Sequence, residues 1–135
     1  MVLKLRIIRN GRTILEIPLE EPGWRRLQSV LKSEFKEFDR GHRSLIRFFE
    51  TLANETRFRM LEEMLHDEKR FSDFMAEMEL NPKTVNENLK ILRERKLVRK
   101  AHHRYKASPL GIGCFLTVFA LRRIIDELMG ELEEF

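Results

Sequence analysis

The sequence predicts a mainly helical protein with small β elements. Apolar residues recur at helical spacing along most of the 135 residues, which is typical of amphipathic helices. Aliphatic and charged residues alternate near the N-terminus, as in a β-hairpin, and a strand-like basic run follows Lys96. Between these runs lies Asn81–Lys96, a helix with well-defined start signals around which we expect the other elements to be arranged.

The length and cysteine content restrict the class of protein. A chain of 135 residues with one cysteine, Cys114, fits one domain with an appendage and excludes an internal disulfide or a cysteine-rich zinc cluster. No apolar run approaches the roughly 18 residues that span a bilayer, and the N-terminus lacks a signal-peptide core. We therefore expect a cytoplasmic protein with no membrane association.

Positive charge is concentrated in one segment. Residues 83–106 contain nine Lys/Arg and two Glu, so this segment has a charge of +7 while the whole chain has +4. All other segments together therefore sum to −3. A polyanion that releases counterions on contact is the natural partner for such a segment.

The N-terminus is expected to form a β-hairpin. Two alternating aliphatic rows flank the turn signal Asn10-Gly11: Leu3, Leu5, Ile7 and Leu15, Ile17, Leu19. A two-residue loop would pair Leu5 with Glu16 and place the rows on opposite faces, whereas a three-residue loop, Arg9 to Gly11, pairs Leu5 with Leu15. We expect the three-residue loop, with Gly11 left-handed in a bulged hairpin.

Two helices are predicted next. Trp24, Leu27, Leu31, Phe35 and Phe38 recur at helical spacing up to a break at Asp39–Gly41. A second helix, Arg43–Ala53, is apolar on most sides and is expected to be a central packing helix.

A helix-turn-helix follows them. Asn54 caps a helix that continues to His66–Lys69, and Lys69–Phe71 is a possible short strand. Ser72 then caps a short helix that precedes Asn81.

The helix that begins at Asn81 has one apolar face and one free face. Asn81 is a good N-cap and Pro82 suits the first helical position. Val85, Leu89 and Leu92 form the apolar stripe, while the free face presents polar groups suited to base edges and phosphates: Lys83, Asn86, Glu87 and Lys90. A solvated surface helix has the same pattern. The neighbouring elements must therefore decide between a surface helix and a helix that contacts DNA.

Those neighbours complete a winged helix-turn-helix. Leu97–Lys100 and Tyr105–Ser108 are predicted strands, joined through Ala101–Arg104 into a basic hairpin. The predicted organisation is therefore an N-terminal β-hairpin and amphipathic helix (residues 1–42), a winged helix-turn-helix DNA-binding core (43–110) and a long C-terminal dimerisation helix (111–135).

The C-terminal helix has more apolar surface than the winged core can cover. We expect a second copy of the chain to cover it, with the following interface residues: Ile112, Phe115, Leu116, Phe119, Ile125, Leu128 and Leu132. Packing against the chain's own Trp24–Phe38 helix is the alternative.

Two segments together resemble a known family. LANETRFRMLEEML, followed by FSDFMAEMELNPKTVNENLKILRERKLV, is similar to the ArsR-like winged-helix transcription regulators over about Leu45–Gly111. The resemblance implies a dimer that binds double-stranded DNA through the helix at Asn81 and regulates transcription in the cytoplasm. Where such proteins often have glycine, this chain has Glu79 and Lys96, so those turns require a positive φ or another geometry.

Other departures limit what the resemblance implies. The wing tip is short, which argues against deep minor-groove insertion. Ser72–Met78 contains no cysteine, so metal sensing is not carried over. Adjacent His102 and His103 diverge, which disfavours a metal site, and Cys114 is more typical of a small core residue than of a redox sensor.

The sequence therefore predicts a homodimeric, DNA-binding transcription regulator and no enzyme, cofactor or metal. Bases or nearby phosphates are assigned to Lys83, Asn86, Glu87 and Lys90. The DNA backbone is assigned to Thr84, Arg99, His102, His103 and Arg104. The alternative is a winged-helix adaptor that binds proteins without specific DNA binding. The sequence identifies no small-molecule effector.

Overall fold

The computed structural model describes residues 3–19 and 32–133, with side chains over 3–19 and 41–130. It confirms the predicted fold class, since helices dominate and the sheets are small and antiparallel. The chain divides into two compact units, Met1–Ile46 and Arg47–Phe135. Residues 111–133, predicted as a separate segment, therefore lie in the same unit as the winged core. The predicted helix residues Trp24, Leu27 and Leu31 lie outside the described residues.

The N-terminal hairpin consists of β1 (Lys4–Arg9) and β2 (Arg12–Pro18). The predicted three-residue loop is wrong: Arg9 pairs with Arg12 across a two-residue turn, in which Asn10 and Gly11 both have positive φ. A bulge then shifts the register at Ile14, so that Leu5 lies opposite Ile17. The bulge places both aliphatic rows on one face, which a two-residue loop alone would not do.

The helix α2 (Lys32–Leu52) is continuous, so the predicted break at Asp39–Gly41 is wrong. A single glycine costs a helix about 1 kcal/mol, which flanking helical turns can offset. In contrast, a proline would have removed a hydrogen bond and clashed with the preceding turn. The helix ends at Leu52, and the amide of Ala53 still donates to the Phe49 carbonyl at 2.8 Å.

The helix-turn-helix forms where the cap signals predict it. In α3 (Glu55–His66), Asn54 Oδ1 accepts from the Arg57 amide at 3.0 Å. In α5 (Pro82–Glu94), Asn81 Oδ1 accepts from the Thr84 amide at 2.8 Å. Between them, α4 (Phe71–Glu77) begins two residues earlier than predicted, since its N-cap is Arg70 and not Ser72, and the Asp73 carboxylate accepts from the Arg70 amide at 2.8 Å.

The core of the second unit is formed by α3, α4, α5 and the wing. Its fully buried side chains are Met60, Leu61, Met64, Phe74, Val85, Leu92 and Leu97. On α5, Val85, Leu89 and Leu92 are at most 3% exposed, which confirms the predicted apolar stripe. Burial of each such side chain contributes about 1.5–3 kcal/mol, so the orientation of α5 is strongly determined.

The wing is a small three-stranded sheet of order β3-β5-β4. It contains β3 (Lys69–Arg70), β4 (Val98–Ala101) and β5 (Arg104–Ala107). Val98, Tyr105 and Ala107 are buried on its inner face. The tip is a two-residue turn of His102 and His103, tighter than the predicted Ala101–Arg104 connection.

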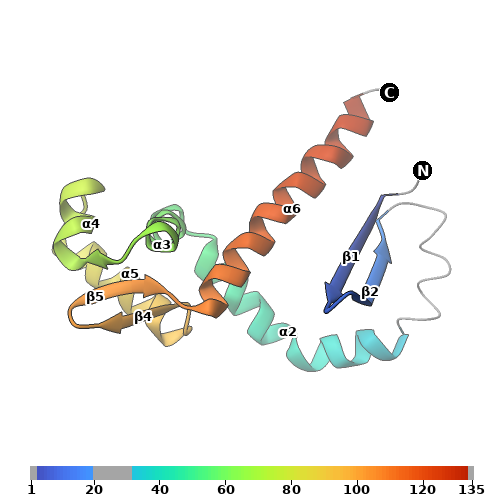
Figure 1. The fold of residues 1–135 in the computed structure, drawn as a ribbon, viewed down its shortest axis with the longest axis horizontal. Helices are drawn as coiled ribbons and strands as arrows, with labels where there is room; N and C mark the ends of the chain where they lie inside the picture. Colours follow the sequence, from blue (N-terminus) through green and yellow to red (C-terminus); the bar gives the residue numbers. More distant parts are fainter. Residues whose placement is uncertain (1–2, 20–31, 134–135) are drawn as a thin grey trace. The chain divides into compact units, whose positions relative to one another are not determined.

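The helix α6 (Pro109–Glu133) packs on the core only at its beginning. Gly111 permits a close approach, since a Cβ there would collide with the carbonyl oxygen of Leu97. Phe115 stacks on Phe58 with ring centroids 4.9 Å apart. Figure 1 shows the later turns of α6 extending beyond α3, α4, α5 and the wing. Within the described ranges, no helix is long and apolar enough to cross a membrane.

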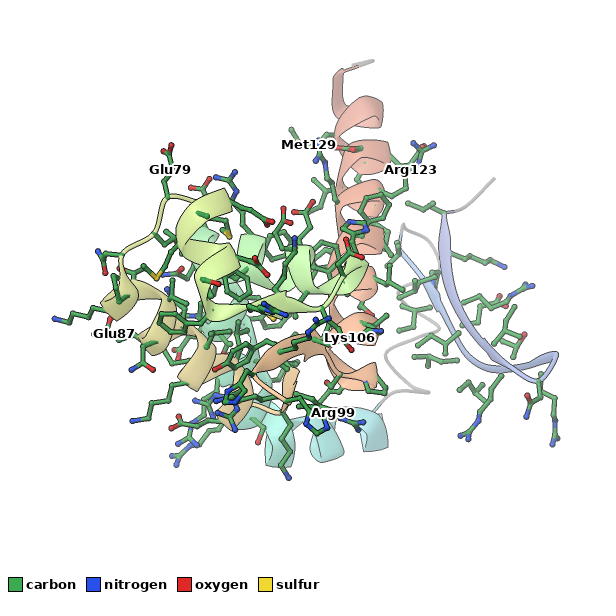
Figure 2. All side chains as sticks on the ribbon, turned by 60° about the vertical axis from the view of Figure 1, so that its left-hand side comes forward. Glu79, Glu87, Arg99, Lys106, Arg123 and Met129 are labelled. Carbon is green, nitrogen blue, oxygen red and sulfur yellow. The ribbon has the colours of Figure 1, made fainter. Side chains whose placement is uncertain are left out.

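Two turns of the core hold non-glycine residues in the left-handed region. Glu79, between α4 and α5, has φ 54°, and Lys96, after α5, has φ 61°. Figure 2 shows Glu79 projecting outward from its turn. At these two positions the regulators that the sequence resembles often have glycine, and this chain keeps the left-handed geometry despite its cost for a residue with a Cβ.

We predict that Lys96→Gly stabilises the protein by about 1 kcal/mol, because glycine adopts this φ without strain. Lys96→Ala is the control, since it removes the same charge but keeps the Cβ. Urea unfolding followed by circular dichroism measures both variants. Equal stability of the two variants would show that the turn is not strained.

Candidate nucleic-acid interface

The free face of α5 presents a row of polar side chains to solvent. Lys83, Asn86, Glu87 and Lys90 are all exposed, as predicted. Figure 2 shows Glu87 projecting outward from α5. Lys83 Nζ and Glu87 Oε1 are 4.0 Å apart at highly exposed positions, so their ion pair is weak and leaves both side chains available to a partner.

A groove separates α5 from the wing. Its volume is about 650 Å³, and its floor includes Leu89, Val98 and Tyr105. Four cations line it, Lys90 and Arg93 from α5 and Arg99 and Lys100 from β4, together with Asn86 and Glu94. Lys100 Nζ lies 5.4 Å from the ring centroid of Tyr105. No ion pair within the described part of the chain neutralises these four cations, so the groove favours an anion.

The two edges of α5 differ in chemistry. Asn86, Lys90 and Arg93 follow one another at spacings of four and three, which places them along the edge beside the wing. Thr84 belongs to the opposite edge and is half-buried, and its carbonyl accepts a hydrogen bond from the buried Asn88 amide at 2.9 Å. Thr84 is therefore less accessible to a partner than the other predicted contacts.

The outer face of the wing is also basic. Arg99 and Lys106 are cross-strand neighbours on this face, and Arg104 lies beside them. Arg104 Nη1 is 3.6 Å from Glu68 Oε2, so the charge of Arg104 is partly compensated within the chain. His102 and His103 at the tip are exposed, with φ 50° and 63°. In Figure 2, Arg99 projects outward from the wing.

Arg57 connects α5 to the end of α2. Its Nε donates to the Thr51 carbonyl at 2.9 Å and one terminal nitrogen donates to the Glu50 carbonyl at 3.3 Å. Its other terminal nitrogen donates to Asn88 Oδ1 on α5 at 3.3 Å. The planar guanidinium therefore satisfies free carbonyls at the C-terminus of α2 and holds α5 with the same fork.

Acidic side chains gather on another part of the core. A cleft of about 600 Å³ between α3 and the α4–α5 turn is lined by Arg59 and by five glutamates: Glu55, Glu62, Glu63, Glu77 and Glu79. Nearby, Lys69 Nζ lies 2.8 Å from Glu77, and this hydrogen bond raises the pKa of the Lys69 ammonium. The core thus separates an acidic region on α3 and α4 from the basic region on α5 and the wing.

Neither the cysteine nor the possible metal ligands among the described residues form a second functional site. Cys114 is half-buried in α6, and burial raises the pKa of its thiol, which disfavours the reactive thiolate. Among the described residues, no group of three or more His, Cys, Asp or Glu is placed to hold a metal ion.

The sequence reasoning missed four residues of this region. Arg93 and Lys100 line the groove, and Arg57 and Asn88 position α5. Helical spacing from Asn86 and Lys90 could have identified Arg93. Strand alternation could have identified Lys100, since it lies two residues after the buried Val98. No local pattern connects Arg57 to Asn88, because their contact depends on the tertiary packing of α3 against α5.

Comparison with a protein-family model and with solved structures agrees with this architecture. Residues 54–100 match the model of a family described as bacterial regulatory protein, arsR family, which confirms the resemblance over that segment. The structure is similar to reduced HlyU from Vibrio cholerae N16961, with TM-score 0.54, 22% identity, and coverage of 64% of this chain and 96% of that chain. It is also similar to the transcriptional regulator HlyU from Vibrio vulnificus CMCP6, with TM-score 0.52, 19% identity, and coverage of 65% and 97%. No curated protein sequence matches this chain.

We predict that Arg57→Ala lowers the free energy of unfolding by about 1.5–3 kcal/mol, the range for hydrogen bonds that involve a charged group. Arg57→Lys should recover only part of this loss, because an ammonium cannot reproduce the fork. Arg59→Ala on the same helix is the control, since Arg59 is exposed. Denaturant unfolding measures all three variants, and an Arg57→Ala protein as stable as the Arg59→Ala protein would contradict this role.

Proposed function

We propose that this protein is a transcription regulator that binds double-stranded DNA as a homodimer, with α5 in the major groove and the wing on the adjacent backbone. The fold of an arsR-type regulator is shown by the family match and the structural neighbours. The name of the Vibrio vulnificus neighbour describes a transcriptional regulator. The specific DNA contacts and the dimer are our inference from the residues of this chain.

The observation that supports the proposal most is the unneutralised groove between α5 and β4. Lys90 and Arg93 from the helix and Lys100 from β4 line the same space, and Arg99 borders it. A backbone phosphate suits this groove, because Arg and Lys bind phosphate oxygens through charge-assisted hydrogen bonds. The acidic cleft on α3 and α4 would be repelled by the same polyanion, so the charge separation orients the core on the duplex.

The free face of α5 has the chemistry for base recognition. Asn86 can form two hydrogen bonds with adenine, and Glu87 can accept from the amino group of cytosine. Lys90 lines the groove and suits a phosphate or a guanine edge. The buried stripe on the opposite side of α5 fixes the direction of these side chains, since it leaves the helix one way to pack.

The later turns of α6 have the pattern of a helix–helix interface. Cys114, Val118, Leu121, Ile125 and Leu128 follow at alternating spacings of four and three, the period of a coiled-coil seam. Cys114 and Val118 pack on the chain's own core, but Leu121 is 42% and Ile125 48% exposed. Figure 2 shows Met129 and Arg123 on different sides of this helix.

Some residues of the dimer interface predicted from the sequence are therefore less suited to contact a second chain. Ile112 and Phe115 use part of their surface on their own core, so they are less available to a partner than expected. Leu116, Phe119 and Ile125 remain exposed and Leu128 is half-buried. The side chain of Leu132 lies outside the described residues.

The function is tested by selecting duplexes from a random library and measuring their affinity against salt concentration by fluorescence anisotropy. We expect a selected sequence motif, and an affinity that falls steeply as salt rises. Failure to select any sequence, or binding insensitive to salt, would reject the proposal and favour the protein-binding adaptor.

In the same assay, Asn86→Ala and Lys90→Ala should differ in kind. Asn86→Ala should lose about 1–3 kcal/mol of discrimination at one base position, because it removes a base contact. Lys90→Ala should weaken all sequences and reduce the salt slope by about one, because it removes a phosphate contact. If both variants have the same sequence-independent effect, Asn86 does not contact a base.

Dimerisation is tested by replacing Leu121 and Ile125 with lysine. Both residues are exposed in the single chain, so the fold should persist, whereas a dimer would bury unpaired charge at its interface. Light scattering at micromolar concentration should show a dimeric wild type and a monomeric double variant with much weaker DNA binding. Ala120→Lys, on another face of α6, is the matched control. A monomeric wild type, or a double variant that stays dimeric, would contradict the proposed interface.

A further inference from the structure

We propose that the N-terminal hairpin, residues 3–19, is a second DNA-contacting arm whose tip arginines bind the backbone beside the site that α5 occupies. This inference rests on the proposed function but concerns a different part of the chain. The hairpin lies outside residues 54–100, which match the family model, so its role does not follow from that match.

The tip of the hairpin places two like charges opposite each other. Arg9 and Arg12 are direct cross-strand partners on either side of the Asn10-Gly11 turn. Like charges in this position destabilise a strand pair. Among the side chains described, those of residues 3–19 and 41–130, the side chain of neither arginine has an ion-pair or hydrogen-bond partner. The tip is therefore a concentrated positive charge that an external anion would stabilise.

The same hairpin pairs Lys4 and Arg6, its other two cations, with a carboxylate. Glu16 Oε1 lies 3.2 Å from Lys4 Nζ, and Glu16 Oε2 accepts from Arg6 Nε at 3.0 Å. These interactions, the hydrogen bond from Lys4 first, lower the pKa of the Glu16 carboxyl. The two cations at the base of the hairpin thus share one carboxylate, whereas the arginines at its tip have no carboxylate partner among the described side chains.

Double-stranded DNA is the partner that best fits this tip. The wing has the same arrangement, since Arg99 and Lys106 are also cross-strand neighbours on an exposed face. Beside the tip arginines, Ile8 is 57% and Ile14 63% exposed, and the bulge leaves Ile14 without a cross-strand partner. Exposed apolar side chains beside cations also occur in proteins that bind along the minor groove, whose two walls are the phosphate backbones.

The test compares Arg9→Gln/Arg12→Gln with wild type on a duplex selected by the wild-type protein, with flanks extending beyond the site of α5. We expect the salt slope to fall by roughly 0.9 for each phosphate that the variant no longer neutralises, hence nearly two per chain. Hydroxyl-radical protection should disappear from the flanks and persist at the central site. Arg9→Lys/Arg12→Lys should restore most of the slope, because it retains both charges.

Arg122→Gln/Arg123→Gln is the matched control, because it removes the same charge from exposed positions that are already paired with Asp126 and Glu127. It should leave the flank protection unchanged. An Arg9→Gln/Arg12→Gln protein with wild-type slope and protection would overturn the arm while leaving DNA binding by α5 intact, and would point to a different partner for the tip. A wild-type protein that selects no duplex would overturn the proposed function and the arm together.

Discussion

The burial of one face of α5 is the constraint on which the rest of the structure depends. Val85, Leu89 and Leu92 insert into a core formed with α3, α4 and the wing, and this packing leaves the helix a single orientation. Asn81 fixes where the helix starts, and the Arg57 fork ties the helix to the end of α2. Asn86, Glu87 and Lys90 face solvent because the opposite side is fully used by the core. The direction of the candidate base contacts is therefore a result of hydrophobic packing.

The second determinant is the distribution of charge. Acidic side chains surround the cleft on α3 and α4, while Lys90, Arg93 and Lys100 line the groove between α5 and β4 and form no ion pair among the described residues. Lys69, close to the acidic region, is instead paired with Glu63 and Glu77. The same contrast separates the base of the N-terminal hairpin from its tip.

Sequence patterns over a few residues correctly predicted the helix caps and the buried face of α5. The features that were predicted wrongly or missed depend mostly on contacts between residues distant in sequence. The caps at Asn54 and Asn81 and the stripe on α5 were correct, because each depends on residues within a few positions of one another. The hairpin register was wrong because a bulge at Ile14 aligns the aliphatic rows, which spacing alone does not reveal. The break in α2 was wrong because a polar stretch with one glycine is only a weak signal to end a helix. Arg57 was missed as a positioning residue since its partners lie on two other helices.

The most direct test of the central claim is a map of the DNA-bound surface by NMR. Backbone amide and arginine side-chain signals of the isotopically labelled protein would be followed while a selected duplex is added. The account predicts the largest shifts at Asn86, Lys90 and Arg93 and at Arg99 and Lys100, with little change at Glu62 and Glu63. Shifts concentrated on α3 and α4, with α5 and β4 unchanged, would contradict it.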